Sequence, residues 1–183
     1  MRISTKSRFV AALASATLVA AVVIAAPAHA AAVGPICDKK VPVQTCQGMT
    51  SDGAPYVMMV PANFNGTVAL YSHGYRYNID LPAGMLPTVP AGYKVTNTPE
   101  PIPGGNPAIA NYFLGNGMAI MGSGFSRQGW NLDAAVATNV ELVGAFKTAF
   151  PTTKHVLAWG SSLGGIITQT LAEKYPTLVD AVA

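Results

Sequence analysis

The sequence predicts an α/β protein in which a mostly parallel β-sheet carries helices on both faces. From residue 67 onward, short apolar segments alternate with segments of helical periodicity. Glycine-rich turns follow several of the apolar segments, and two further strand-like segments precede the alternation. Because alternating strands and helices favour parallel pairing, the helices are expected to cover both faces in a three-layer arrangement.

The predicted strands are short apolar or β-branched segments bounded by turn residues. They are Gln44–Met49, Tyr56–Val60, Thr67–Tyr71, Met118–Met121, Val156–Trp159 and Leu178–Ala183. The predicted helices are Pro107–Leu114, Leu132–Phe150 and Ile166–Tyr175. Asn106 and Asn131 precede the first two of these helices and are expected to cap them. The apolar stripe of the second helix is expected to face the core.

Residues 1–30 have the pattern of an export signal. Three basic residues precede a long uncharged apolar stretch, and Ala28-His29-Ala30 fits the small-x-small cleavage motif. The alternative is a membrane anchor, since about eighteen uncharged residues are close to the minimum for a membrane span. We expect cleavage, which leaves residues 31–183 as a secreted partial domain without a membrane span.

The charge of the chain does not indicate a nucleic-acid partner. The formal net charge of +3 comes from 11 basic and 8 acidic residues, and three of the basic residues lie in the export signal. The remaining chain is therefore electrically balanced, and it contains no basic patch or nucleic-acid-binding motif. It also lacks the glycine-rich loops that bind phosphates or dinucleotides, so no cofactor is predicted.

The chain contains two cysteines, Cys37 and Cys46, both after the export signal. In an exported protein such a pair is expected to form a disulfide, and the alternative is two free thiols. No cluster of cysteine and histidine residues has the spacing of a metal site, so no metal is predicted.

The central motif of the sequence is Gly160-Ser161-Ser162-Leu163-Gly164. It follows an apolar strand and opens a helix, which is the context of a nucleophile elbow. Gly160 and Gly164 are expected to serve the tight turn, because side chains there would collide. Ser162 is then predicted to be the nucleophile, and the backbone N–H of Leu163 to be one donor of an oxyanion hole. The alternative is an ordinary glycine-serine turn.

A second motif, Ser72-His73-Gly74-Tyr75, ends the third predicted strand. In serine hydrolases that carry an elbow, the loop at this place supplies the other oxyanion N–H. We assign that donor to Tyr75, with Gly74 allowing the backbone to turn. The alternative is a strand-ending glycine with a structural histidine beside it.

Residues 77–105 form a long segment rich in proline and glycine. Such a loop inside a compact domain is often functional. We expect it to line or cover a substrate pocket. The alternative is a surface loop that has no role in substrate binding. Its candidate pocket residues are Tyr77, Leu81, Met85, Leu86 and Tyr93. Trp130, in a later loop, is expected to pack in the core rather than to line the pocket.

The motifs Ser72-His73-Gly74-Tyr75 and Gly160-Ser161-Ser162-Leu163-Gly164 occur in this order, each at the end of a predicted strand. Together they resemble the N-terminal part of an α/β-hydrolase. The stretch from Gly122 to Trp130 is similar to secreted bacterial members of that family. The resemblance implies a secreted serine hydrolase that uses Ser162, with Leu163 and Tyr75 as oxyanion donors. It also implies that an acidic residue and then a histidine follow the serine in the chain.

The sequence after Ser162 contains Glu173 and Asp180 but no histidine. His155 is expected about 20 Å from Ser162, at the opposite end of its strand, at about 3.3 Å per residue, and His73 belongs to the oxyanion loop. We therefore expect a fragment of a larger hydrolase that has little turnover alone and a truncated sheet.

The function that these features predict is hydrolysis of carboxylic esters through an acyl-enzyme on Ser162. The substrate is a small-molecule or polymeric ester or amide. The alternatives are a peptidase or an acyltransferase that uses the same nucleophile, and a non-catalytic binding module on a hydrolase-like scaffold.

Overall fold

The computed structural model describes residues 32–38 and 40–183. The predicted export signal lies outside these residues. Seven strands form one sheet in the order β1-β2-β3-β5-β4-β6-β7. The strands are β1 (Val33–Cys37), β2 (Val43–Met49), β3 (Pro55–Pro61), β4 (Thr67–Ser72), β5 (Ala119–Ser123), β6 (His155–Gly160) and β7 (Ala181–Val182). The helices are α1 (Pro107–Gly115), α2 (Leu132–Ala149) and α3 (Leu163–Lys174), with a 3₁₀ turn at Pro103–Gly105.

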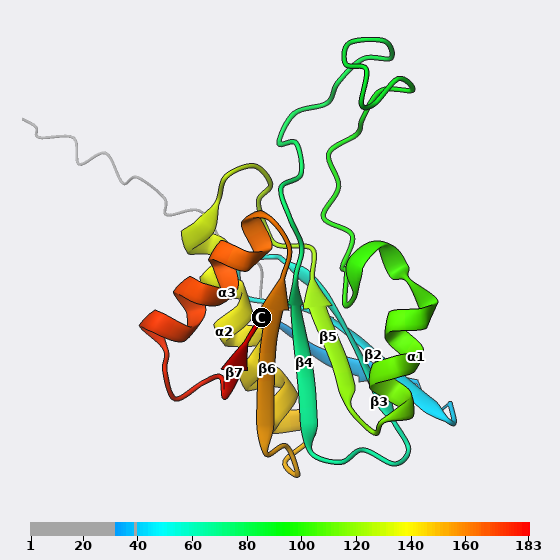
Figure 1. Ribbon diagram of the computed structural model, residues 1–183, viewed down its shortest axis with the longest axis vertical. Coiled ribbons are helices and arrows are strands. Elements are labelled where there is room, and N and C mark those ends of the chain that lie inside the picture. The colour runs from blue at the N-terminus through cyan, green and yellow to red at the C-terminus, as the bar shows by residue number, and fades with distance from the viewer. Residues whose placement is uncertain (1–31, 39) are drawn as a thin grey trace, which may run out of the picture.

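The sheet has a parallel part and an antiparallel part. Strands β5, β4, β6 and β7 run parallel to one another. Strands β1, β2 and β3 form an antiparallel edge, and β3 joins it to β5 by antiparallel pairing. The predicted α/β class is therefore confirmed, and the parallel strands end together at one rim of the sheet (Figure 1).

Helices cover both faces of the sheet, as predicted. On one face, α2 and α3 contribute Leu142, Phe146 and Ile167 to a core that includes Leu70 of β4. On the other face, α1 packs Phe113 and its neighbours against a smaller cluster around Ile120 of β5. Figure 1 shows α1 on one side of the central strands and α2 and α3 on the other.

Most predicted boundaries lie within two residues of the observed ones, and the differences have physical causes. Strand β1 was not predicted, because Gly34 and Pro35 interrupt its apolar pattern and its pairing depends on β2. The last strand is shorter than expected, since Pro176–Leu178 form a turn and Asp180 a bend before Ala181. Asn106 caps α1 by accepting a hydrogen bond from Ala108. The prediction that Asn131 caps α2 is wrong: its backbone has φ −115° and ψ 66°, and its side chain makes no cap bond.

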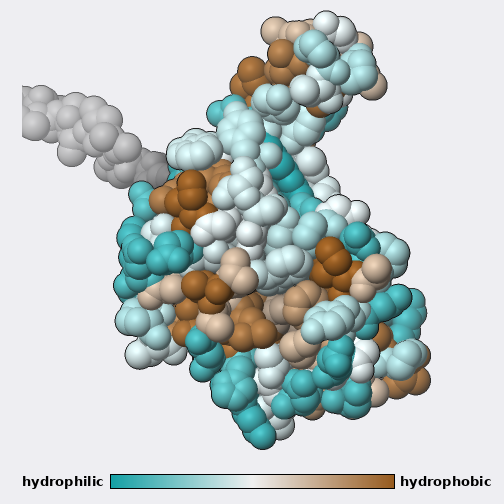
Figure 2. Space-filling model, in the orientation of Figure 1, coloured by the Kyte–Doolittle hydropathy of each residue, from teal (hydrophilic) through white to brown (hydrophobic). Residues whose placement is uncertain are grey.

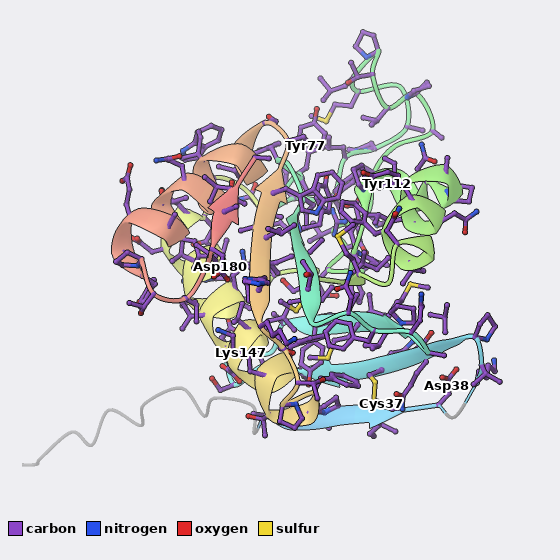
Figure 3. The ribbon with its side chains drawn as sticks, turned by 60° about the horizontal axis from the view of Figure 1, so that its bottom comes forward. Cys37, Asp38, Tyr77, Tyr112, Lys147 and Asp180 are labelled. Carbon is purple, nitrogen blue, oxygen red and sulfur yellow. A yellow bond between two sulfur atoms is a disulfide. The ribbon has the colours of Figure 1, made fainter. Side chains whose placement is uncertain are left out.

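The predicted disulfide between Cys37 and Cys46 is present, with an S–S distance of 2.03 Å. It joins β1 to β2 at the antiparallel edge, and Figure 3 shows the labelled Cys37 well away from Tyr77. None of the helices that the structure describes has the length and apolar character that crossing a bilayer requires.

Apolar side chains line part of the sheet face beside β7. A cavity of about 250 Å³ lies there between β6, β7 and α1. Its lining residues are Ala69, Phe113, Leu157, Ala158, Trp159, Ala181, Val182 and Ala183. Figure 2 shows hydrophobic surface across the middle of this face.

Candidate active site

The turn between β6 and α3 holds two serines, Ser161 and Ser162, in a strained backbone. Ser162 has φ 56° and ψ −124°, a left-handed conformation that is uncommon for a residue other than glycine. Its side chain is exposed and makes no hydrogen bond to another described residue. A strained, exposed residue at a helix start suggests a functional role, because such backbone geometry costs about 1–3 kcal/mol and must be held by its surroundings.

The two glycines of the motif allow this turn to pack against β4. A Cβ atom on Gly164 would lie 1.9 Å from the carbonyl oxygen of Ser72, and one on Gly160 would lie 2.5 Å from the backbone of Gly164. No side chain fits at either position. Gly165, the next residue, differs, because its Cβ would have 3.7 Å of clearance from its nearest neighbour.

The loop that follows β4 contacts the turn directly. A Cβ atom on Gly74 would lie 3.5 Å from the Cβ of Ser162 and 3.3 Å from the carbonyl oxygen of Ser161. The structure therefore brings the two sequence motifs side by side, although 88 positions separate Gly74 from Ser162 in the numbering. The contact arises because β4 and β6 are adjacent parallel strands that pair Ser72 with Gly160 at their ends.

Two backbone N–H groups, in this turn and in the loop that contacts it, have no hydrogen-bond acceptor among the residues that the structure describes. Leu163 is the first residue of α3, so its N–H has no acceptor within the helix. The N–H of Tyr75, one residue beyond Gly74, donates no hydrogen bond to any residue that the structure describes. The positive end of the α3 dipole lies at the same place. These donors can stabilise a negative charge that develops beside Ser162.

His73 orients the peptide that carries the Tyr75 N–H. Its Nδ1 lies 2.7 Å from the carbonyl oxygen of Gly74. Because a carbonyl only accepts hydrogen bonds, Nδ1 carries the proton. The Gly74 carbonyl and the Tyr75 N–H belong to one planar trans peptide and point in opposite directions. Fixing the carbonyl therefore also fixes the donor, a role that the sequence did not reveal.

The environment of His73 keeps its ring neutral. The residue is 3% exposed, and its ring centroid lies 4.3 Å from that of Phe125. Burial lowers the pKa of the imidazole below its ordinary value, although the bond to Gly74 opposes this effect. Nε2 is buried and has no hydrogen-bond partner among the described residues. Phe125, like Ser162, has a positive φ, of 52°, so both non-glycine residues with this geometry in the described part of the chain lie at the carboxyl rim.

Ser161, the residue before Ser162, contacts a side chain of β4. The hydroxyl of Ser161 lies 3.1 Å from that of Tyr71. The Tyr71 ring in turn packs on Trp159, with ring centroids 4.8 Å apart. Ser161 therefore belongs to a contact on the α1 face of the sheet, whereas the Ser162 hydroxyl makes no hydrogen bond to another described residue.

No imidazole or carboxylate is hydrogen-bonded to Ser162 among the described residues. His155 lies at the other end of β6, where it pairs with Thr67 at the start of β4. Its ring lies 3.6 Å from the Asp180 carboxylate, which also accepts a hydrogen bond from the N–H of Val156. Figure 3 shows Asp180 well apart from Tyr77. No group of three or more potential metal ligands occurs in residues 32–38 and 40–183.

The proline-rich segment 77–105 rises from the rim as a protruding loop (Figure 1). At its base, Arg76 pairs with Glu100 at 2.6 Å, and Arg76 also donates to the carbonyl of Thr98. Farther out, Leu81 and Tyr93 bridge its two arms. Of the candidate pocket residues, Leu81 is buried inside this segment, whereas Met85 is 60% exposed. Tyr77 lies at the base, between Tyr75 and Tyr93, and its ring meets both of theirs edge to face.

The prediction that Trp130 packs in the core is wrong, because its side chain is 69% exposed. The preceding residue, Gly129, has φ 88°, and its N–H donates to the carbonyl of Arg76. This bond ties the loop after β5 to the base of the protruding segment, and the tryptophan side chain remains on the surface of the rim.

Asp52 holds together elements near the rim, although the sequence pattern predicted it only as part of a turn. Its carboxylate accepts hydrogen bonds from Thr50, Ser126 and Thr138, so it links the β2–β3 turn, the loop after β5 and α2. Burial alone would raise the pKa of Asp52, but the three hydroxyls together lower it. Asp52 thus remains ionised at neutral pH and holds the loop that contains Phe125.

In comparisons with known proteins, no family model matches the chain, and no curated protein is similar to it at a significant level. What the structure defines is the class: an α/β protein with a mixed sheet whose parallel strands end at one rim. The chemistry of that rim is therefore inferred from its geometry.

Proposed function

We propose that this chain carries the nucleophile and the oxyanion hole of an exported serine hydrolase of the α/β-hydrolase family, one that acts on carboxylic esters. The observation that supports it best is the exposed, strained Ser162, which precedes Leu163 and lies against Gly74 of the loop that carries Tyr75. The backbone N–H groups of Leu163 and Tyr75 have no acceptor among the described residues. The disulfide between β1 and β2 supports export, since such bonds persist in oxidising compartments.

In the proposed reaction, the Ser162 hydroxyl oxygen attacks the ester carbonyl. Its proton passes to a histidine base, the group that the resemblance to α/β-hydrolases implies and that the described residues do not place at Ser162. The electron pair of the carbonyl moves to its oxygen, where the N–H groups of Leu163 and Tyr75 stabilise the charge. The alcohol then leaves with a proton, and an acyl group remains on Ser162. Water attacks the acyl-enzyme in the same way and releases the acid.

In this proposal the described residues supply the nucleophilic oxygen, the oxyanion donors and the helix dipole. No imidazole or carboxylate among them is hydrogen-bonded to Ser162. This observation favours one other candidate, a binding module that uses the same rim without catalysis. The two candidates differ in one measurable property, because only a catalytic site makes the Ser162 oxygen unusually reactive toward an electrophile that mimics the tetrahedral state.

Covalent labelling tests the proposal without requiring turnover. The full chain is incubated with an alkyl fluorophosphonate, and the modified residue is identified by mass spectrometry of its peptides. We expect one phosphonyl group on Ser162, at a rate roughly 100-fold above that of the denatured chain, the contribution of an oxyanion hole being about 10²–10³.

Two serine variants make the test specific. Ser162→Ala is expected to abolish labelling. Ser161→Ala, which loses only the hydroxyl bonded to Tyr71, is expected to retain it. Equal labelling of native and denatured chains, or labelling that follows Ser161, would contradict the proposed function and favour a binding module.

A further inference from the structure

An open surface hollow of about 420 Å³, lined mainly by polar side chains, lies at the rim between the protruding segment and the loop after β5. Its lining residues are Asn78, Val95, Asn97, Ser126, Arg127 and Gln128. We call this hollow the amide–guanidinium pocket. Five of its six side chains are polar, in contrast to the apolar cavity beside β7.

Arg127 gives the pocket an uncompensated positive charge. Its side chain has no ion-pair or hydrogen-bond partner among the described residues. The other cations of this region are paired: Arg76 with Glu100 at 2.6 Å, and Lys94 with Asp80 at 2.7 Å.

Two carboxylates adjoin the lining residues, and both are engaged. Asp80 accepts from the N–H of Val95 and pairs with Lys94, and Asp52 accepts from three hydroxyls. Ser126 donates to Asp52 at 2.7 Å, and Thr50 and Thr138 complete its hydrogen bonds. It therefore holds the pocket wall from behind, and its charge is stabilised by three hydroxyl dipoles. The guanidinium is left as the group with free hydrogen-bonding capacity.

The amides of the pocket add further donors. The side chains of Asn78 and Asn97 make no hydrogen bond to another described residue, and each offers two N–H groups. Gln128 is fixed by donation to the carbonyl of Gly124 at 2.6 Å. A guanidinium beside free amides matches a ligand group that only accepts hydrogen bonds and carries negative charge. A carboxylate has these properties, and it can bind both arms of an arginine at once.

The pocket adjoins the proposed oxyanion loop. Gly129 donates to the carbonyl of Arg76, and the Asn78 side chain packs against Gly129. Asn78 follows Gly74 by four positions, so the two cannot be more than about 14 Å apart, even in an extended chain. One substrate molecule can therefore span Ser162 and the pocket.

We propose that the amide–guanidinium pocket binds a carboxylate of the substrate, so that the preferred esters carry a negative charge some distance from the bond that is cleaved. This inference rests on the proposed function, because it names the substrate class of that same site. Arg127 is the specificity-determining residue, and the amides of Asn78 and Asn97 complete the recognition.

Binding to the full-length Ser162→Ala variant tests the pocket independently of catalysis. The probes are monomethyl suberate, which carries one carboxylate, and dimethyl suberate, which has the same chain and no charge. Affinities are measured by NMR titration at low ionic strength. Because hydrogen bonds to a charged group are the strong ones, we expect monomethyl suberate to bind roughly tenfold more tightly.

Substitutions at Arg127 test whether its guanidinium causes the difference in affinity between the two probes. Arg127→Gln should bring the affinity ratio of the two probes close to one, and Arg127→Lys should give an intermediate ratio, since lysine keeps the charge but not the planar fork. Lys154→Gln, which removes an exposed cation at the opposite end of the sheet, is the matched control and should leave the ratio unchanged. Added salt should also lower the ratio.

Equal affinity for the two probes, or a ratio that Arg127→Gln does not change, would overturn the proposal. Tighter binding of a neutral sugar such as methyl glucoside would also overturn it, because it would point to a site for hydroxyl groups. The outcomes separate the two proposals: carboxylate binding without labelling of Ser162 refutes only the hydrolase, and labelling without carboxylate binding refutes only the pocket.

Discussion

Two regions meet at the carboxyl rim and are held in different ways. The turn around Ser162 is fixed by backbone packing, because Gly160 and Gly164 have no space for a side chain against Ser72 and its neighbours. At the base of the segment 77–105, the Arg76–Glu100 ion pair and the backbone of residues 97–101, which packs on Gly122 and Gly124, hold the chain. Farther out, the Leu81–Tyr93 bridge joins its two arms. A Cβ atom added to Gly84, near the tip of the segment, would have no neighbouring atom within 4 Å.

The difference shows which part of the rim is held rigidly. A nucleophile must be held within a fraction of an ångström, and backbone packing between β4, β6 and α3 provides that precision. The outer part of the protruding segment can open locally at a small cost in free energy, because few contacts hold it. Substitutions in the two regions should therefore differ greatly in their effects.

The largest effect is expected for Gly164→Ala. Its Cβ would lie 1.9 Å from a backbone oxygen of β4, so the strand and the helix would have to separate. We expect the free energy of unfolding to fall by about 4 kcal/mol or more, as in the most damaging core substitutions. Chemical denaturation followed by circular dichroism measures this loss.

Gly165→Ala is the matched control, because its Cβ would have 3.7 Å of clearance and the residue lies within a helix. It should change the free energy of unfolding only slightly, or raise it, since alanine favours helix more than glycine does. Equal losses for the two variants would show that backbone packing does not fix the turn.

A smaller effect is expected from the protonation of His73. Burial lowers its pKa in the folded state below the ordinary value of about 6.5. Below pH 6.5 the unfolded chain therefore binds a proton that the folded chain does not, so stability falls as the pH falls. The slope approaches about 1.4 kcal/mol per pH unit until the folded-state pKa is reached.

The stability of the His73→Asn variant between pH 7 and pH 5 checks this prediction. Asparagine can still donate to the Gly74 carbonyl but does not titrate, so the variant should lose the His73 part of the pH slope while keeping the oriented peptide. An unchanged slope would mean that His73 is already solvated in the folded protein.

The smallest effect is expected in the protruding segment. Arg76→Gln removes an ion pair whose side chains are only 17% and 21% exposed. It should increase amide hydrogen exchange of the segment by about tenfold, equivalent to a local loss of about 1.4 kcal/mol, while the sheet stays protected. Lys94→Gln breaks a pair that is far more exposed, so it should leave exchange unchanged. Faster exchange throughout the sheet would show that the segment supports the whole fold.

The local features of the site could be predicted from sequence because they depend on residues close together in the chain. The motif around Ser162 combines an apolar strand, two glycines and a helix within a short stretch, and the structure has those elements there. The disulfide and the cap at Asn106 were predicted for the same reason.

The features that could not be predicted depend on contacts between distant residues. Asp52 receives hydrogen bonds from Ser126 and Thr138, which follow it by 74 and 86 positions. The exposure of Trp130 depends on a bond between Gly129 and Arg76, which the local sequence does not encode. The role of His73 required the peptide orientation, and the amide–guanidinium pocket required two loops to meet.

The bridge between Leu81 and Tyr93 closes the protruding segment before its tip, so the residues beyond the bridge do not determine how the rim is built. The entropic cost of lengthening a closed loop grows only with the logarithm of its length. A peptide tag or a fluorophore placed between Gly84 and Pro90 would therefore be a non-perturbing attachment point, from which the protein could be immobilised with Ser162 still accessible.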